Sequence, residues 1–200
     1  LSTPTPYPTP GFDLNLGDLL YEDDFSDEAG WQTFRSDSGN AVIANQELTL
    51  AIQNKESQLT SYATLPWQSD FYLKMDVKVS LCSDAQDAYG ILFRVADSDN
   101  YDRLWINCLG QTRIERRYKG EMLPLYDWAV NGKLRPGAPQ RYTLALRVKG
   151  SRLSVFINDT LLYETSDVIL KEGGLGVTAR SRGLWPLTVA FSNFELYAVE

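Results

Sequence analysis

The sequence predicts an all-β fold, a two-sheet antiparallel sandwich of the jelly-roll type. Short stretches in which apolar and polar residues alternate recur along the chain, as in strands that have one buried face. Turns rich in Gly, Asn and Asp separate these stretches at regular spacing. We find no segment of ten or more residues with a helical period. Many short strands joined by such turns are typical of sandwiches and jelly rolls.

Length and composition indicate one domain that follows an extended arm. A chain of 200 residues, 44% of them hydrophobic, can bury a substantial core as a single sandwich. Residues 1–17 are predicted to be a Pro/Thr-rich extended arm or linker, because Pro alternates with Thr or Ser as far as Pro10. Residues 18–200 are predicted to form a single jelly-roll domain.

The expected strands follow one another closely. The clearest alternation runs over residues 70–81, where Phe71, Leu73 and Met75 are expected to point inward and Lys74 outward. The expected strands are residues 19–25, 32–35, 41–44, 47–52, 58–64, 70–81, 89–95, 101–108, 111–118, 122–130, 141–148, 152–157, 161–165, 174–180 and 187–198.

Three strands within residues 88–118 carry the candidate ligand surface. In the middle strand an apolar set of residues alternates with an aromatic and cationic set, and period-two geometry places the two sets on opposite faces. Sugar recognition needs flat apolar faces and planar polar groups, which the second set supplies. The apolar set is Leu104, Ile106 and Cys108. The candidate ligand-binding residues are Arg94, Tyr101, Arg103, Trp105, Asn107, Arg113, Glu115 and Trp128.

The same pattern also has a plainer interpretation. Strands are enriched in Trp and Tyr through packing alone, and the arginines would then pair with Asp97, Asp99 and Asp102. Under the ligand-binding interpretation, the substitution Trp105→Ala abolishes glycan binding with little loss of stability. Two further aromatic residues, Tyr126 and Trp185, are expected to rim the same sheet.

Composition excludes several classes of function. The chain contains no histidine, which excludes Ser-His-Asp and Cys-His nucleophilic sites and ordinary zinc or iron sites. A net charge of −7 disfavours nucleic acid as a partner, because phosphates need a basic surface. No apolar run approaches the ~20 residues of a membrane span. For a glycosidase, Asp76 and Glu115 are the only carboxylate pair that we would nominate, so the sequence favours a protein that is not an enzyme.

Cys82 and Cys108 are the two cysteines of the chain. An even count in a chain with extracellular traits suggests a disulfide that joins two strand ends. The alternative is a pair of small buried side chains, which is a frequent environment of free cysteine.

Seven phrases of the sequence carry a family resemblance. They are DDFSDEAGW, NQELTL, DFYLKMDVKV, YGILFRVADSDNYDRLWI, RYTLALRVKGSRLSVFINDTLLYE, GGLGVTARS and VAFSNFELY. Their order resembles the concanavalin A-like lectin and glucanase jelly-roll superfamily, over residues 19–199. Within it, the chain is most similar to the laminin-G-like and 3-keto-disaccharide-hydrolase-like domains of bacterial extracellular proteins. The resemblance implies the fold, and a concave sheet that binds or cleaves polysaccharide.

The resemblance also sets expectations for carboxylates and metal. The glucanase branch carries a Glu-x-Asp-x-Glu strand whose carboxylates face the substrate, and this chain has no such run. Many members hold a structural calcium, for which Asp23, Asp24 and Asp27 could supply hard oxygen ligands. The chain departs from that pattern at Ser192, where an acidic partner is usual.

The first hypothesis for the function is a non-catalytic extracellular domain that binds carbohydrate or another ligand through its aromatic and arginine face. The alternative is a structural subunit of an extracellular surface assembly or filament, in which residues 1–10 pack on an identical neighbour. A third is a glycoside-acting enzyme. The expected location is extracellular or at the cell surface, as a secreted protein or one that is lipid-anchored through the N-terminal linker. The expected partner is a polysaccharide or glycan, with no nucleic acid and no membrane span.

Overall fold

The computed structural model describes residues 14–183 and 186–199, which form fifteen strands in two antiparallel sheets and contain no helix. The nine-stranded sheet consists, in spatial order, of β13 (Thr160–Ser166), β12 (Arg152–Ile157), β11 (Gln140–Lys149), β6 (Phe71–Leu81), β15 (Leu187–Val199), β4 (Glu47–Ile52), β3 (Gly39–Ala44) and β2 (Phe34–Ser36), with β1 (Leu16–Asp23) also paired to β15. The six-stranded sheet consists of β10 (Glu121–Val130), β9 (Gln111–Tyr118), β8 (Asn100–Asn107), β7 (Ala88–Asp97), β14 (Gly174–Arg180) and β5 (Gln58–Tyr62).

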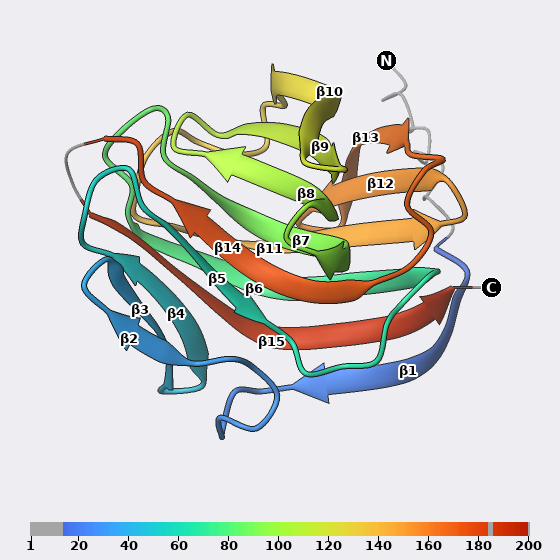
Figure 1. The fold of residues 1–200 in the computed structure, drawn as a ribbon, viewed down its shortest axis with the longest axis horizontal. Helices are drawn as coiled ribbons and strands as arrows, with labels where there is room; N and C mark the ends of the chain where they lie inside the picture. Colours follow the sequence, from blue (N-terminus) through green and yellow to red (C-terminus); the bar gives the residue numbers. More distant parts are fainter. Residues whose placement is uncertain (1–13, 184–185, 200) are drawn as a thin grey trace, which may run out of the picture.

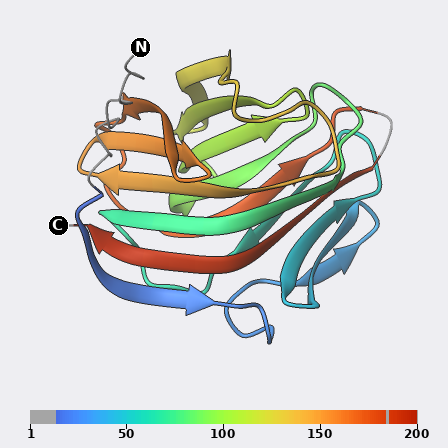
Figure 2. The ribbon, with the colours of Figure 1, turned by 180° about the vertical axis from the view of Figure 1, so that it is seen from behind.

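The two sheets stack face to face. The six-stranded sheet lies in front in Figure 1, and the nine-stranded sheet lies in front in Figure 2. The chain crosses between the sheets several times, because β6 lies in one sheet and the next four strands along the chain lie in the other. The predicted two-sheet jelly-roll sandwich is therefore confirmed.

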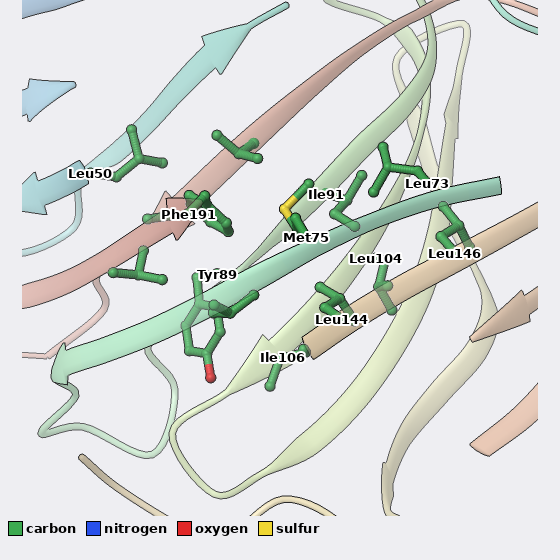
Figure 3. Packing of buried hydrophobic residues seen from close by; sticks show 14 of the residues in the cluster. Leu50, Leu73, Met75, Tyr89, Ile91, Leu104, Ile106, Leu144, Leu146 and Phe191 are labelled. Carbon is green, nitrogen blue, oxygen red and sulfur yellow. The ribbon is translucent and has the colours of Figure 1, made fainter. Parts of the chain in front are cut away.

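The core lies between the sheets and follows from the alternation of the strands. Leu73 and Met75 of β6 are buried and face Ile91, Leu104 and Ile106 of the six-stranded sheet (Figure 3). Burial of such side chains stabilises the fold by about 1.5–3 kcal/mol each. The alternation predicts an inward set of six residues in 70–81, and five of them pack in the core: Phe71, Leu73, Met75, Val77 and Val79. The sixth, Leu81, was predicted wrongly, because it lies at the strand end and is 46% exposed.

Strand ends differ from the prediction where a side chain forms a turn with its own backbone. The first strand was expected over residues 19–25, but β1 ends at Asp23. The Asp23 Oδ1 atom accepts a hydrogen bond from the Phe25 amide at 2.7 Å, and Phe25 has a φ of 56°. Such a short-range bond offers the backbone an alternative to strand pairing and therefore ends the strand.

The predicted disulfide is present. Cys82 follows the end of β6 and Cys108 follows the end of β8, and their sulfur atoms are bonded with a Cα–Cα distance of 5.5 Å. Because β6 and β8 belong to different sheets, the bond links the two layers of the sandwich.

The arm predicted over residues 1–17 falls mainly outside the described residues, which begin at Leu14. Its last part already belongs to the domain, because β1 begins at Leu16. Leu14 packs against Tyr72, Ala145 and Phe156 on the outside of the nine-stranded sheet. A helix that is long and apolar enough to cross a membrane is not found in the described residues.

A candidate ligand-binding face on the six-stranded sheet

The face of the six-stranded sheet that points away from the core, here called the outer face, carries most of the predicted site residues. Alternation along β8 puts Arg103 and Trp105 on the outer face, while Leu104 and Ile106 enter the core. The register of β9 places its own side chains beside them in pairs. These cross-strand pairs are Tyr101 with Arg117, Arg103 with Glu115, and Trp105 with Arg113.

Glu115 lies at the centre of this set. Its Oε1 atom accepts hydrogen bonds from Arg103 Nε at 3.0 Å and Trp105 Nε1 at 2.9 Å, and a further, short one from Arg103 Nη2. Its Oε2 atom lies 3.1 Å from Arg113 Nε. Burial opposes ionisation of Glu115, but the two guanidiniums and the indole N–H outweigh it and lower the pKa of the carboxyl group. Glu115 is therefore a carboxylate that fixes the surrounding donors.

The prediction that Trp105 lies on an open face, available to a ligand, is wrong. The indole lies on the outer face, but it is 0% exposed. The Arg103 guanidinium carbon is 4.2 Å from the ring centroid and that of Arg180 is 4.8 Å from it, so cations occupy the aromatic surface. Gly90, which pairs with Trp105 across the sheet, leaves no room for a side chain of its own, because a Cβ atom there would lie 1.9 Å from the Leu104 carbonyl oxygen. Trp105 supports the arginines, and Trp105→Ala should lower stability as well as any binding.

A first hollow of about 510 Å³ opens over this set. Aromatic surface in it comes from Tyr62, which is half-buried, and from Tyr101. The residues that line it are Gln58, Thr60, Tyr62, Leu92, Ser98, Tyr101, Arg103, Glu115, Arg117, Met122, Arg180 and Arg182.

A second hollow of about 460 Å³ lies on the same face and shares Arg180 and Arg182 with the first. Trp128 contributes a half-buried indole, and the Arg113 guanidinium carbon is 5.9 Å from the ring centroid. Asn107 lines this hollow too, but its amide is engaged: Oδ1 accepts bonds from the Leu109 and Gln111 amides, and Nδ2 donates to Gln111 Oε1 at 2.8 Å. The two hollows, which share Arg180 and Arg182, are together called the groove below.

Arg94 does not belong to the outer face, contrary to the prediction. The pairing of β7 with β8 shifts register between Phe93 and Asp97, and Arg94 has a φ of 50°. The bulge turns this side chain into the protein, where it is 0% exposed. Its guanidinium donates to Asp102 at 3.5 Å and forms a short bond to the Gly150 carbonyl in the turn between β11 and β12.

Arg94 is part of a buried ionic cluster at one end of the sandwich. Asp102 is 0% exposed, and Arg116 forms a short ion pair with the buried carboxylate of Asp167. Burial, followed by the Asp167 carboxylate, raises the pKa of Asp102 to about 7, against the opposing influence of Arg94 and Arg116. The predicted arginine–aspartate pairing thus exists for Asp102 with Arg94, and for Asp99 with Arg117 at 3.0 Å. Asp97 instead accepts bonds from the Asp99 amide and from Asn100, and no ion pair among the described residues includes it.

Two further predicted residues, Asp76 and Tyr126, have other positions. Asp76 and Glu115 cannot act as a carboxylate pair, because Asp76 is in the nine-stranded sheet and bonds Thr143 and Asn193 there. Tyr126 stacks on Tyr163 of β13 with ring centroids 3.6 Å apart, joining the edges of the two sheets. Trp185 lies outside the described residues.

The sequence pattern missed Arg180, Arg182 and Tyr62. Gly176, Thr178 and Arg180 share one parity in β14, so the alternation could have placed Arg180 on a face of its strand. The pattern could not show that β14 pairs with β7 and β5, because strand order depends on contacts between distant segments.

The proposed calcium ligands line a hollow of about 840 Å³ beside β1 and β15, strands of the nine-stranded sheet, whereas the groove lies on the six-stranded sheet. Asp23, Asp24 and Asp27 each accept a backbone N–H bond, from Phe25, Ser26 and Ala29 respectively. Within residues 14–183 and 186–199, no group of three or more His, Cys, Asp or Glu side chains is placed to hold a metal ion. Calcium binding there stays a prediction, and the function proposed below uses no metal.

Comparison with known proteins supports the fold. No family model matches the chain, and no curated protein matches it. Carbohydrate-binding module CBM66 from Bacillus subtilis superposes with a TM-score of 0.65 at 17% identity, covering 84% of this chain and 96% of that one. A Bacillus subtilis protein of unknown function with a galectin-like fold gives a TM-score of 0.67 at 13% identity, covering 92% and 99%. Bacillus licheniformis β-glucanase gives 0.59 at 13%, covering 90% and 98%.

The predicted concanavalin A-like jelly roll is confirmed by these structures. Identities of this size establish the fold alone, so the similarity to laminin-G-like and 3-keto-disaccharide-hydrolase-like domains stays a prediction.

Proposed function

We propose that this domain binds a glycan in the groove on the outer face and does not cleave it. The observation that carries the proposal is the composition of the groove. Half-buried aromatic rings, Tyr62 and Trp128, lie in its two hollows, and a row of arginines lies between them. Sugar rings present flat C–H faces that pack on aromatic rings, and hydroxyl groups that pair with planar donors. Structural neighbours that include a carbohydrate-binding module support the assignment.

The carboxylates of the groove favour binding without cleavage. Glycoside hydrolysis ordinarily uses two carboxyl groups, one of which must carry a proton as general acid. Among the described residues that line the two hollows, Glu115 is the only acidic one. Its pKa is lowered, and its oxygens are engaged by Arg103, Arg113 and Trp105, so it is a poor proton donor.

The proposal includes an extracellular or cell-surface location. The disulfide between Cys82 and Cys108 is of the kind that persists in oxidising compartments. A secreted or lipid-anchored protein would meet polysaccharide there.

The test is a glycan array followed by affinity gel electrophoresis with the glycans that bind. Tyr62→Ala and Trp128→Ala should each weaken binding about fivefold, since one stacking contact contributes about 1 kcal/mol. Trp67→Ala is the matched control, because Trp67 is 57% exposed and lines neither hollow. Absence of binding to every glycan, or equal losses in all three variants, would refute the proposal. Release of reducing ends from a bound glycan by the unmodified protein would refute its non-catalytic part.

A further inference from the structure

The outer face carries more positive charge than its carboxylates balance. Arg103 and Arg113 share Glu115, Arg113 also lies 3.4 Å from Asp127, and Arg117 pairs with Asp99. The ion pairs among the described residues include neither Arg180 nor Arg182. In a chain with a net charge of −7, this local excess of guanidinium groups is not a consequence of composition.

Arg180 is the most unusual of these groups. Its side chain is partly buried, its Nε atom is buried with no hydrogen-bond partner among the described residues, and its guanidinium lies against Trp105. Burial lowers the pKa of Arg180, and the neighbouring cations Arg182 and Arg103 lower it further, against the opposing influence of Glu115. A partly buried guanidinium without an ion-pair partner is costly, because its desolvation is not offset by pairing.

Position makes this pair of arginines a natural anion site. Arg180 and Arg182 are the residues that line both hollows, so an anion held by them lies at the middle of the groove. On one side Tyr62 offers a ring surface and Gln58 and Thr60 offer polar groups, and on the other side lies Trp128. A single sugar residue with an acidic substituent would place its charge on the arginines while its neighbours along the chain reach the aromatic rings.

We infer that the glycan bound in the groove is an acidic saccharide, whose carboxylate or sulfate group is held between Arg180 and Arg182. This inference rests on the proposed function and names its ligand class. A guanidinium matches both anions, because its planar donors form paired, charge-assisted hydrogen bonds with two oxygens. The ligand also supplies the counterion that Arg180 lacks, so neutral glycans of the same size should bind more weakly.

The experiment compares three polymers by affinity gel electrophoresis and isothermal titration calorimetry: polygalacturonate, dextran sulfate and uncharged dextran. We expect binding to one or both acidic polymers at least tenfold tighter than to dextran, and weakening with added NaCl. The polygalacturonate and dextran sulfate arms distinguish a carboxylate from a sulfate ligand. A single-stranded oligonucleotide is the fourth probe, and equally tight binding to it would overturn the assignment to a saccharide.

Two variants test whether the preference for acidic polymers over dextran depends on Arg180 and Arg182. Arg180→Ala and Arg182→Ala should each reduce acidic-polymer binding about tenfold and should reduce dextran binding by a clearly smaller factor, because dextran carries no charge for the arginines to hold. Arg182 is exposed, so its variant tests the site even where Arg180→Ala fails to fold. Arg152→Ala is the matched control, because Arg152 is an exposed arginine of β12 in the other sheet. Tight binding of neutral glycans with no effect of either variant would overturn this inference and leave the proposed function intact, whereas no binding to any glycan would overturn both.

Discussion

Glu115 of β9 and Asp102 of β8 are buried carboxylates on neighbouring strands, yet their surroundings shift their pKa values in opposite directions. Glu115 accepts hydrogen bonds from the Arg103 guanidinium and the Trp105 indole, forms an ion pair with Arg113, and has a lowered pKa. Asp102 has one long contact to Arg94 at 3.5 Å and a second carboxylate, Asp167, nearby, and its Oδ1 atom has no hydrogen-bond partner among the described residues. Its pKa is raised to about 7. The number of close donors, and not burial alone, decides which form each carboxyl group takes.

The raised pKa of Asp102 predicts a pH dependence of folding stability. In the unfolded chain this carboxyl group titrates near its ordinary value of about 4, so between about pH 4 and pH 7 the folded protein binds the extra proton. The contribution to the free energy of unfolding is therefore fully present below about pH 4 and is lost as the pH rises through about 7. The loss should amount to a few kcal/mol. Urea unfolding at a series of pH values measures it.

Asp102→Asn isolates that effect from other titrating groups. The amide cannot ionise, so the difference in unfolding free energy between variant and parent should move in favour of the variant as the pH rises from 4 to 8. Arg94, Arg116 and Asp167 face this group and remain in both proteins. Asp97→Asn, at an exposed turn, serves as the control and should not show that trend. Parallel pH curves for Asp102→Asn and the parent would contradict the assignment.

At the scale of the strand, the sequence predicts the side on which a residue lies only where that side is fixed by the geometry of its own strand. Alternation along β6, β8 and β9 follows from the geometry of one strand, so the sides of Leu73, Arg103 and Glu115 could be assigned from the pattern. The position of Arg94 could not, because a bulge in β7 changes the parity and is set by pairing with β8. Burial of Trp105 was equally hidden, since one of the cations that cover it, Arg180, comes from a strand distant in sequence.

The disulfide links the ends of β6 and β8, which belong to different sheets, and its removal should lower the stability of the fold. Cys82 and Cys108 are 26 residues apart, and closing a loop of that length lowers the entropy of the unfolded chain enough to stabilise the fold by about 3.5 kcal/mol. The double variant Cys82→Ala/Cys108→Ala should lose about that amount in urea unfolding. The parent protein measured under reducing conditions should lose a similar amount. Stability within 1 kcal/mol of the oxidised parent, by either route, would show that core packing alone holds the layers together.

At the scale of the whole molecule, two hollows on different sheets differ in the charge that lines them. The groove on the six-stranded sheet is lined mainly by arginines, with Glu115 as its acidic residue. The hollow beside β1 and β15 is lined by Lys74 and by six acidic residues, Glu22, Asp23, Asp24, Asp27, Asp76 and Glu195. The net charge of −7 therefore conceals an uneven distribution of charge, because arginines gather at the groove. Neither the length nor the composition could reveal this, because it depends on which strands the fold assigns to each sheet.

The first strand, β1, and the last strand, β15, pair with each other. β1 pairs with the final part of β15, from Leu16 with Val199 to Asp23 with Phe194. The Tyr21 ring packs edge-on against Phe194 with centroids 6.1 Å apart, and Asp23 Oδ2 accepts a bond from Trp31 Nε1 at 3.1 Å. Deleting residues 1–23 removes this pairing, exposes the core residues Phe194 and Trp31, and should lower the unfolding free energy by several kcal/mol.

Deleting residues 1–10 is the matched comparison, because it leaves β1 and all of these contacts in place. Thermal unfolding followed by circular dichroism should show a much larger fall in Tm for the longer deletion than for the shorter one. Size-exclusion chromatography of the same two proteins tests the assembly alternative separately, since an arm that packs on a neighbouring subunit would be lost equally in both. Equal Tm values for the two deletions would mean that β15 needs no partner on that side, and would contradict the role assigned to β1.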